Sequence, residues 1–146
     1  MSKYILETTS LNQSNYDTNR LLLGSWCNND DKKTKIVDYH WHNRNKLYED
    51  SKYVQILFEK YLIDLSNSLN SIHETSHSVD FWRVVIGPWL FFFISICLDR
   101  YEMLKYAAKN YEIKFVREPL YKQASWVPVD FVDFNHQFNS DEWNYY

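Results

Sequence analysis

The sequence predicts an α/β fold, because short apolar segments typical of strands stand both before and after two long segments with helical periodicity. The strand-like segments are 4–8, 21–26, 35–39 and 112–116. The helical segments are 47–72 and 78–110. We expect a single α/β domain over residues 1–146, since the length falls in the range of roughly 100–200 residues that is usual for one domain.

Composition excludes several classes of function. The formal charge of −3 argues against a nucleic-acid partner, whose binding surface needs a basic excess. Gly24 and Gly87 are the only glycines, so neither a Walker loop nor a dinucleotide-binding glycine motif can be present. Cys27 and Cys97 lie far apart without a CxxC partner, which argues against a disulfide framework and against a cysteine zinc site.

The first three strands are predicted from short apolar runs. Residues 21–26 (LLLGSW) are almost continuously apolar, as expected for a strand covered on both faces. Residues 27–34 read as a solvated turn. The third strand, 35–39, ends at the cluster His40-Trp41-His42-Asn43-Arg44, where a long helix follows.

One face of the first helix is predicted to be buried. Its apolar residues follow one another at intervals of 7, 4, 3, 4, 4 and 3, which is helical spacing. These residues are Leu47, Val54, Phe58, Tyr61, Leu65, Leu69 and Ile72.

The second helix is expected to start after the N-cap Ser78, with Asp80 near its positive end, and to run to about Asn110. Pro88 lacks an amide hydrogen, so a kink or a break is predicted at Gly87-Pro88. The apolar run 84–98 is shorter than the roughly 20 residues that a membrane-crossing helix needs, so a buried core helix is predicted. The segment 88–98 is predicted to be central to the core, because it is apolar nearly all round. The stripe expected to continue the helical spacing is Trp89, Phe93, Cys97, Tyr101, Leu104 and Ala108.

The C-terminal segment is predicted to be extended after the strand 112–116. Pro128 limits residues 125–134 to an edge strand or a loop. Ser140, followed by two acids and a tryptophan, reads as the start of a further helix. We therefore expect the chain to be an N-terminal fragment of a longer protein.

The segment between the third strand and the first helix offers the first candidate site. His40 and Arg44 close a strand and open a helix, where α/β proteins commonly assemble sites. Arg44 fits either a phosphate or carboxylate ligand, or a salt bridge to Asp38 or Asp50. His40 and His42 form only a pair, and two ligands do not make a metal site, so no metal is expected.

The link between the two helices offers the second candidate site. His73 and His77 sit where the first helix ends, and we expect them to cap it or to satisfy backbone groups. Arg83 and Asp99 are charged groups in an otherwise apolar helix, and for Asp99 a buried interaction with an arginine that fixes helix packing is expected. No serine or cysteine is marked as an activated nucleophile, so the catalytic residues stay unknown.

Five segments in order resemble the N-terminal part of a transferase family encoded in O-antigen and related surface-polysaccharide regions of bacteria. They are 21–27 (LLLGSWC), 39–48 (YHWHNRNKLY), 72–78 (IHETSHS), 81–90 (FWRVVIGPWL) and 99–103 (DRYEM), with DEWN at 141–144 closing the series. His42-Asn43 departs from the acidic pair expected in this family, which puts any role of that pair in doubt here.

The resemblance implies a Rossmann-like N-terminal half of a two-domain, GT-B-like glycosyltransferase. In such an enzyme this half binds the acceptor, a saccharide or a lipid-linked saccharide, while a nucleotide-sugar donor binds the other half. No cofactor is implied for this chain itself. The matching motifs give five candidate substrate-binding residues, which are His40, Arg44, His77, Trp82 and Arg83. A share in holding the donor phosphates is expected of Arg44 or Arg83.

Other classes of function remain open at this point. The chain could be a small non-enzymatic interaction module, with Trp126, Phe131, Phe134 and Trp143 as an exposed patch, or an inactive truncated gene product. Residues 84–98 allow a peripheral contact with the inner membrane. Because the N-terminus shows no secretion signal, we expect a cytoplasmic location.

Overall fold

A computed structural model describes residues 3–9, 19–28, 34–117 and 128–138. The chain divides into two compact units: residues 1–39 with 103–146 form unit 1, and residues 40–102 form unit 2. Unit 2 is thus inserted between two segments of unit 1. Each unit has a hydrophobic core of its own.

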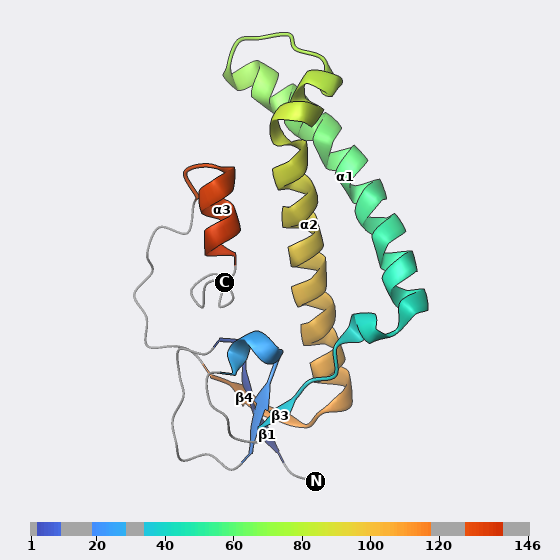
Figure 1. Ribbon diagram of the computed structural model, residues 1–146, viewed down its shortest axis with the longest axis vertical. Coiled ribbons are helices and arrows are strands. Elements are labelled where there is room, and N and C mark those ends of the chain that lie inside the picture. Colours follow the sequence, from blue (N-terminus) through green and yellow to red (C-terminus); the bar gives the residue numbers. More distant parts are fainter. Residues whose placement is uncertain (1–2, 10–18, 29–33, 118–127, 139–146) are drawn as a thin grey trace. The chain divides into compact units, whose positions relative to one another are not determined.

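Unit 1 contains a parallel sheet of four strands, which confirms the α/β class (Figure 1). The strands are β1 (Tyr4–Glu7), β2 (Arg20–Leu22), β3 (Lys35–Ile36) and β4 (Ile113–Val116). Their order is β3-β2-β1-β4, and every neighbouring pair is parallel. All four expected strands are therefore present, although β2 and β3 are shorter than the sequence predicts.

The core of unit 1 is formed by the central strands and the end of a long helix. Leu6 of β1 and Leu21 and Leu22 of β2 are buried against Met103 and Ala107. The apolar run after Leu22 does not continue as a strand, because Ser25–Cys27 turn into a 3-10 helix, η1. At Gly24 the ring of Trp26 lies where a Cβ would stand, so a larger residue at this position would have to displace that ring. The predicted strand end at Trp26 is wrong, because β2 ends at Leu22 and Trp26 belongs to η1.

Helix α1 (Arg44–Ile72) begins after the short 3-10 helix η2 (His40–His42). The Asn43 side chain caps it by accepting hydrogen bonds from the amides of Asn45 and Lys46. The buried stripe is Val54, Phe58, Leu62 and Ser66, with a constant spacing of four. Tyr61 and Ile72 of the predicted face are 44% and 72% exposed, because the stripe continues through Leu62 instead.

Helix α2 (Val79–Asn110) begins after Ser78, whose Oγ accepts a hydrogen bond from the amide of Phe81, as predicted. The helix is continuous across Pro88, so the break does not occur. Within residues 88–98 the buried positions are Leu90 and Ile94 rather than Trp89, Phe93 and Cys97 of the predicted stripe. Cys97, a member of the predicted stripe, is exposed.

The segment 88–98, predicted to be central to the core, is buried at Leu90 and Ile94 but exposes Phe91 and Phe92 by 44% and 45%. Among the described residues, α2 is the one helix whose length and composition would allow it to cross a membrane, and 22% of its most apolar 18-residue stretch is buried. Its buried side pairs with α1 in the core of unit 2, formed by Val54, Phe58, Leu62, Trp82, Leu90 and Ile94.

A third helix, α3 (Phe131–Gln137), replaces the extended conformation predicted for 131–134. Asp130 caps it by accepting a hydrogen bond from the Asp133 amide. Phe134 is fully buried, so it cannot belong to the exposed patch considered for an interaction module. Trp126, Trp143 and the helix start expected at Ser140 lie outside the described residues.

Candidate functional site

His40 is the centre of a polar network at one end of the pair of helices α1 and α2. Its Nε2 lies 3.0 Å from Oδ1 of Asp99, and its Nδ1 lies 3.7 Å from Oδ2 of Asp50. The ring is only 1% exposed. His40 therefore joins η2 to α1 and to α2, and in this arrangement it does not reach a substrate in solvent.

Lys46 extends this network by bridging the two helices. Its Nζ donates to Asp50 on α1 and to Glu102 on α2, both at 2.8 Å. Trp41 Nε1 also donates to Asp50 at 2.8 Å. Asp99 in addition accepts from Arg100 Nη1 at 2.6 Å, so the expected arginine partner is its sequence neighbour. We call His40, Trp41, Lys46, Asp50, Asp99 and Glu102 the His40 network.

The pKa of Asp50 reports the electrostatics of the His40 network. Burial on its own would raise this pKa, but the hydrogen bonds from Lys46 and Trp41, together with the charge of Lys46, bring it below its ordinary value. Burial opposes the charge of Lys46 too, and its two carboxylate partners still raise its pKa. The network thus stabilises the ionised forms of both groups.

We expect the Asp50 carboxylate to stabilise the fold at neutral pH and to lose this effect in acid. Its folded-state pKa lies below the unfolded value of 3.8, so the contribution is present above that value and disappears as the pH falls through the folded pKa. The difference in free energy of unfolding between the native chain and Asp50→Asn, measured with urea from neutral to acidic pH, should therefore shrink below pH about 4. A difference that stays constant over this range would contradict the assignment.

Arg44 is the first residue of α1 and is exposed. Among the described residues no acid forms an ion pair with it, and Asp50, one of its two expected partners, binds Lys46 instead. Asn43 stands where the resembled family is expected to have an acidic residue. Its side chain still caps α1, because asparagine and aspartate side chains alike accept hydrogen bonds from amides of the first turn. Arg44 thus presents a guanidinium group beside a helix N-terminus.

His77 and Trp82 belong to the turn at the other end of the two helices, which Asn70 organises. Asn70 Oδ1 accepts hydrogen bonds from Thr75 Oγ1, the His77 amide and Trp82 Nε1, each at 3.0 Å. Its Nδ2 donates to the His77 carbonyl at 2.8 Å. The His77 ring stacks on Phe81 at 4.0 Å. As expected, the backbone of His73 caps α1 by donating to the Leu69 carbonyl.

Replacing Asn70 with alanine is expected to lower the free energy of unfolding by about 2 kcal/mol, because three donors lose one shared acceptor. Urea unfolding followed by tryptophan fluorescence measures this loss. Asn70→Asp is the comparison, since it keeps the acceptor oxygen and replaces the donor to the His77 carbonyl with a charged carboxylate oxygen. Equal losses in the two variants would contradict the role given to the oxygen.

Arg83 forms a bidentate ion pair with Glu59 across the two helices, with distances of 2.7 and 2.8 Å. The hydrogen bonds between these groups raise the pKa of Arg83 and lower that of Glu59. Both side chains are 39% or more exposed, so solvent screens the pair. The guanidinium group of Arg83 is already bound by the Glu59 carboxylate, so Arg83 is less available than Arg44 to bind a phosphate.

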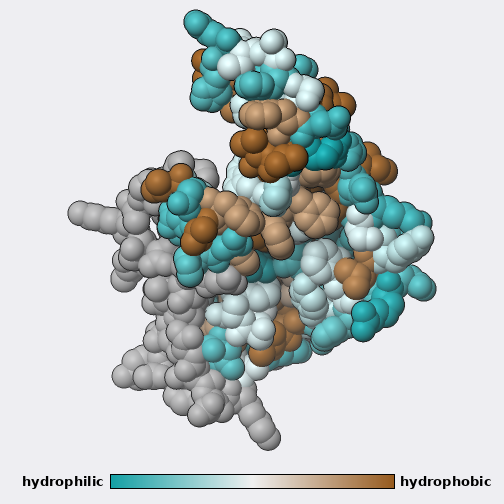
Figure 2. Space-filling view, turned by 45° about the horizontal axis from the view of Figure 1, so that its top comes forward, coloured by the Kyte–Doolittle hydropathy of each residue, from teal (hydrophilic) through white to brown (hydrophobic). Residues whose placement is uncertain are grey.

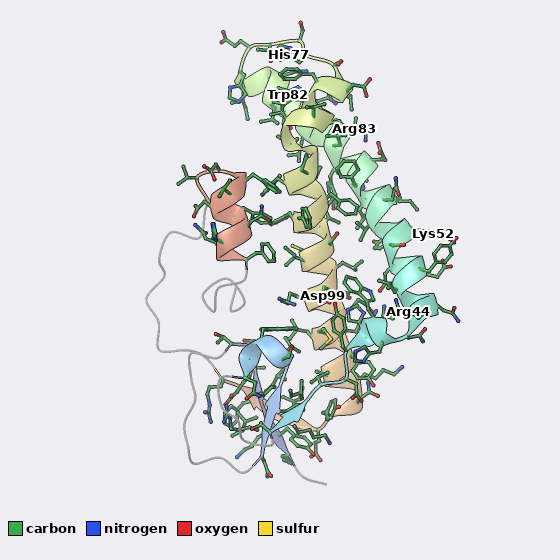
Figure 3. All side chains as sticks on the ribbon, viewed as in Figure 1. Arg44, Lys52, His77, Trp82, Arg83 and Asp99 are labelled. Carbon is green, nitrogen blue, oxygen red and sulfur yellow. The ribbon has the colours of Figure 1, made fainter. Side chains whose placement is uncertain are left out.

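The five predicted site residues fall into two groups that do not form one site. His77, Trp82 and Arg83 lie at the turn that joins α1 and α2, and Arg44 lies at the opposite end of α1 (Figure 3). Because α1 has 29 residues, its two ends are about 43 Å apart. Trp82 is also buried, and its indole nitrogen serves the turn.

Unit 1 contains a charged cluster that the sequence did not reveal. Glu7, at the carboxyl end of β1, is 1% exposed and accepts from Nη2 of Arg20 at 2.7 Å and from Nη1 of Arg117 at 3.1 Å. Glu7 and Arg117 lie where β1 meets β4, the point at which the strand order reverses. In open parallel sheets this switch point is the usual position of a ligand crevice. The available signal was an acid, Glu7, within the first predicted strand and a base, Arg117, directly after the last one.

The described residues contain no group of three or more His, Cys, Asp or Glu side chains placed to hold a metal ion. This concerns residues 3–9, 19–28, 34–117 and 128–138 alone. In this part of the chain, Arg44 is the polar feature best suited to an anionic ligand, because the carboxylate of Glu7 already engages Arg20 and Arg117.

Comparison with known proteins adds one match. Residues 4–146 match a family model described as "LIC12162 family transferase", which covers nearly the whole chain. Searches of curated proteins and of solved structures gave no match.

Proposed function

Because the chain belongs to the LIC12162 family of transferases, we propose that it is the acceptor-side domain of a sugar transferase in bacterial surface-polysaccharide synthesis, such as that of O-antigen. The complete enzyme takes a nucleotide sugar as donor and a saccharide or lipid-linked saccharide as acceptor. The acceptor hydroxyl oxygen forms a bond to the anomeric carbon of the sugar, the bond from that carbon to the diphosphate breaks, and the nucleoside diphosphate leaves. A base takes the hydroxyl proton.

The observation that supports this proposal best is the parallel sheet with the order β3-β2-β1-β4. The same order opens the doubly wound sheets that bind nucleotides and related ligands outside the carboxyl ends of their strands. In a GT-B-like enzyme, one such sheet stands in each half. Fold alone does not establish activity, so the proposal also depends on the family and on the sequence motifs.

Within this proposal Arg44 is the residue that contacts a phosphate of the acceptor or donor. It is exposed, it opens α1, and a guanidinium group can hold a phosphate through two parallel hydrogen bonds. His77 remains a candidate for contact with a sugar, since its exposed ring stacks on Phe81. The enzyme acts in the cytoplasm, at the inner membrane surface, where the exposed apolar residues of α2 favour a peripheral contact.

The test uses the product of the complete gene, a panel of nucleotide sugars, and lipid-linked saccharides as acceptors. We expect saturable binding by calorimetry, and release of nucleoside diphosphate that depends on the acceptor. Arg44→Ala should weaken binding of the phosphate-bearing ligand by about tenfold or more, because a charge-assisted hydrogen bond is lost. Lys52→Ala is the matched control, since it removes another exposed cation of α1 (Figure 3). Absence of saturable binding with every donor and acceptor would overturn the proposal.

A further inference from the structure

Unit 2 contains a groove of about 520 Å³ along the pair of helices α1 and α2. From α1 it is lined by one stripe with a spacing of four: Tyr53, Leu57, Tyr61 and Leu65. From α2 the corresponding stripe is Trp89, Phe93, Cys97 and Tyr101. The helix face that the sequence predicts to be core therefore forms the wall of an open groove.

The lining of the groove is apolar, and no charged side chain belongs to it. Leu90 and Ile94, which are 3% and 7% exposed, also line it and connect it to the core of unit 2. Three tyrosines, exposed by 44–60%, add hydroxyl groups to the lining. A volume of this size lies within the range of about 300–1,000 Å³ that small-molecule sites have.

The surroundings of the groove favour a lipid over a protein partner. A protein docking face is apolar on one side of a helix, but α2 exposes apolar side chains outside the groove as well, such as Val84, Val85, Phe91 and Phe92. Figure 2 shows hydrophobic residues, in brown, on the surface of these helices. The 15 residues from Val84 to Leu98 carry no charge, and a helical segment of this length measures about 22 Å, which is short of the hydrocarbon thickness of a bilayer.

We propose that the groove between α1 and α2 binds the hydrocarbon chain of a lipid-linked saccharide. The chain lies between the two apolar stripes, and the tyrosine hydroxyls meet the polar headgroup or water. That this lipid is the acceptor rests on the proposed function. The binding of a hydrocarbon chain does not rest on the proposed function, because it is argued from the apolar lining of the groove.

Cys97 gives a direct readout of occupancy. It lines the groove and is exposed, whereas Cys27 is fully buried, so a maleimide reagent added to the folded protein reports on Cys97. The groove wall partly desolvates the Cys97 thiol and raises its pKa, and the labelling is therefore done at pH about 8.5. Mass spectrometry of peptides confirms which cysteine has reacted.

The probe is dodecyl maltoside, a saccharide with one hydrocarbon chain, used below its micelle concentration. We expect it to slow the labelling of Cys97 saturably, by about tenfold at ten times its Kd, because only the unoccupied groove reacts. Maltose, which has no chain, should not change the rate. An unchanged rate with dodecyl maltoside would overturn the proposal.

Two pairs of variants separate the groove from the surface around it. Phe93→Arg puts a charge into the groove, and Phe92→Arg puts the same charge on the neighbouring residue outside it. Tyr61→Arg and Ile63→Arg make the equivalent pair on α1, in case a variant of α2 does not fold by circular dichroism. We expect protection to be lost in the first member of each pair and kept in the second. Equal protection within both pairs would overturn the proposal.

A second copy of the chain is the competing occupant. If sedimentation showed a dimer, and labelling of Cys97 without lipid slowed as the protein concentration rose, the groove would be a dimer interface and the proposal would be wrong. The proposed function is tested separately. Protection of Cys97 by dodecyl maltoside, combined with no sugar transfer by the complete gene product, would uphold the groove and overturn only the transferase role.

Discussion

Replacing Glu7 with glutamine is expected to lower the free energy of unfolding by about 3–5 kcal/mol, because two guanidinium groups lose the charge of the carboxylate that they share. The side chains of Arg20 and Arg117 are only 9% and 16% exposed, so water replaces this carboxylate poorly. The three residues also connect β1, β2 and the end of β4. Urea unfolding at neutral pH measures the loss.

Two further variants make the test of Glu7 specific. Glu112→Gln removes an exposed acid that pairs with Lys3 at 3.6 Å, and its expected effect is below about 1 kcal/mol. Replacing Glu7 with Leu and both arginines with Met should recover most of the stability, since apolar residues of similar volume often replace a buried charge cluster without loss. An effect of Glu7→Gln no larger than that of Glu112→Gln would refute the role of the buried carboxylate.

Replacing Asp99 with alanine is expected to cost about 3 kcal/mol, because the buried His40 ring and Arg100 both lose an acceptor. Since these contacts join η2 to α2, the effect should concentrate there. Hydrogen exchange followed by mass spectrometry should show faster exchange in peptides that cover residues 40–50 and 95–102.

The controls for Asp99 separate hydrogen bonding from charge. Asp99→Asn keeps an oxygen that can accept from His40, so we expect a smaller loss than with alanine. A double-mutant cycle with His40→Leu should give a coupling energy of about 1 kcal/mol or more, because the two side chains are in direct contact. Strictly additive effects of Asp99→Ala and His40→Leu would be inconsistent with the contact.

The contrast between the predicted and the observed faces of the helices has a simple physical origin. In α1, polar residues alternate with apolar ones, so periodicity places the buried face to within one residue, and Leu62 takes the position predicted for Tyr61. In α2, residues 88–98 are apolar on nearly every side, and periodicity then carries no information about which side is buried. The packing against α1 selects Leu90 and Ile94 and leaves Trp89 and Phe93 in the groove.

In the candidate site, too, the sequence predicted some features and only the structure showed the others. His40 and Arg44 were predicted from their place between a strand and a helix, but only the structure distinguishes the buried ring of His40 from the exposed guanidinium of Arg44. Asn70 and Glu7 carried no motif, and their roles depend on partners brought together by the fold. The role of a single polar residue such as Asn70 or Glu7 can be assigned only once its hydrogen-bond and ion-pair partners are known.

The sequence by itself determined the α/β class, the four strands, the two long helices and the N-cap at Ser78, because propensity, capping and apolar periodicity act over a few neighbouring residues. Only the tertiary structure decided the strand order, the pairing of Glu7 with Arg117, and which side of α2 faces α1. These features join residues that are far apart along the chain. Their energies come from burial and charge pairing between such residues, and no local pattern records which partners will meet.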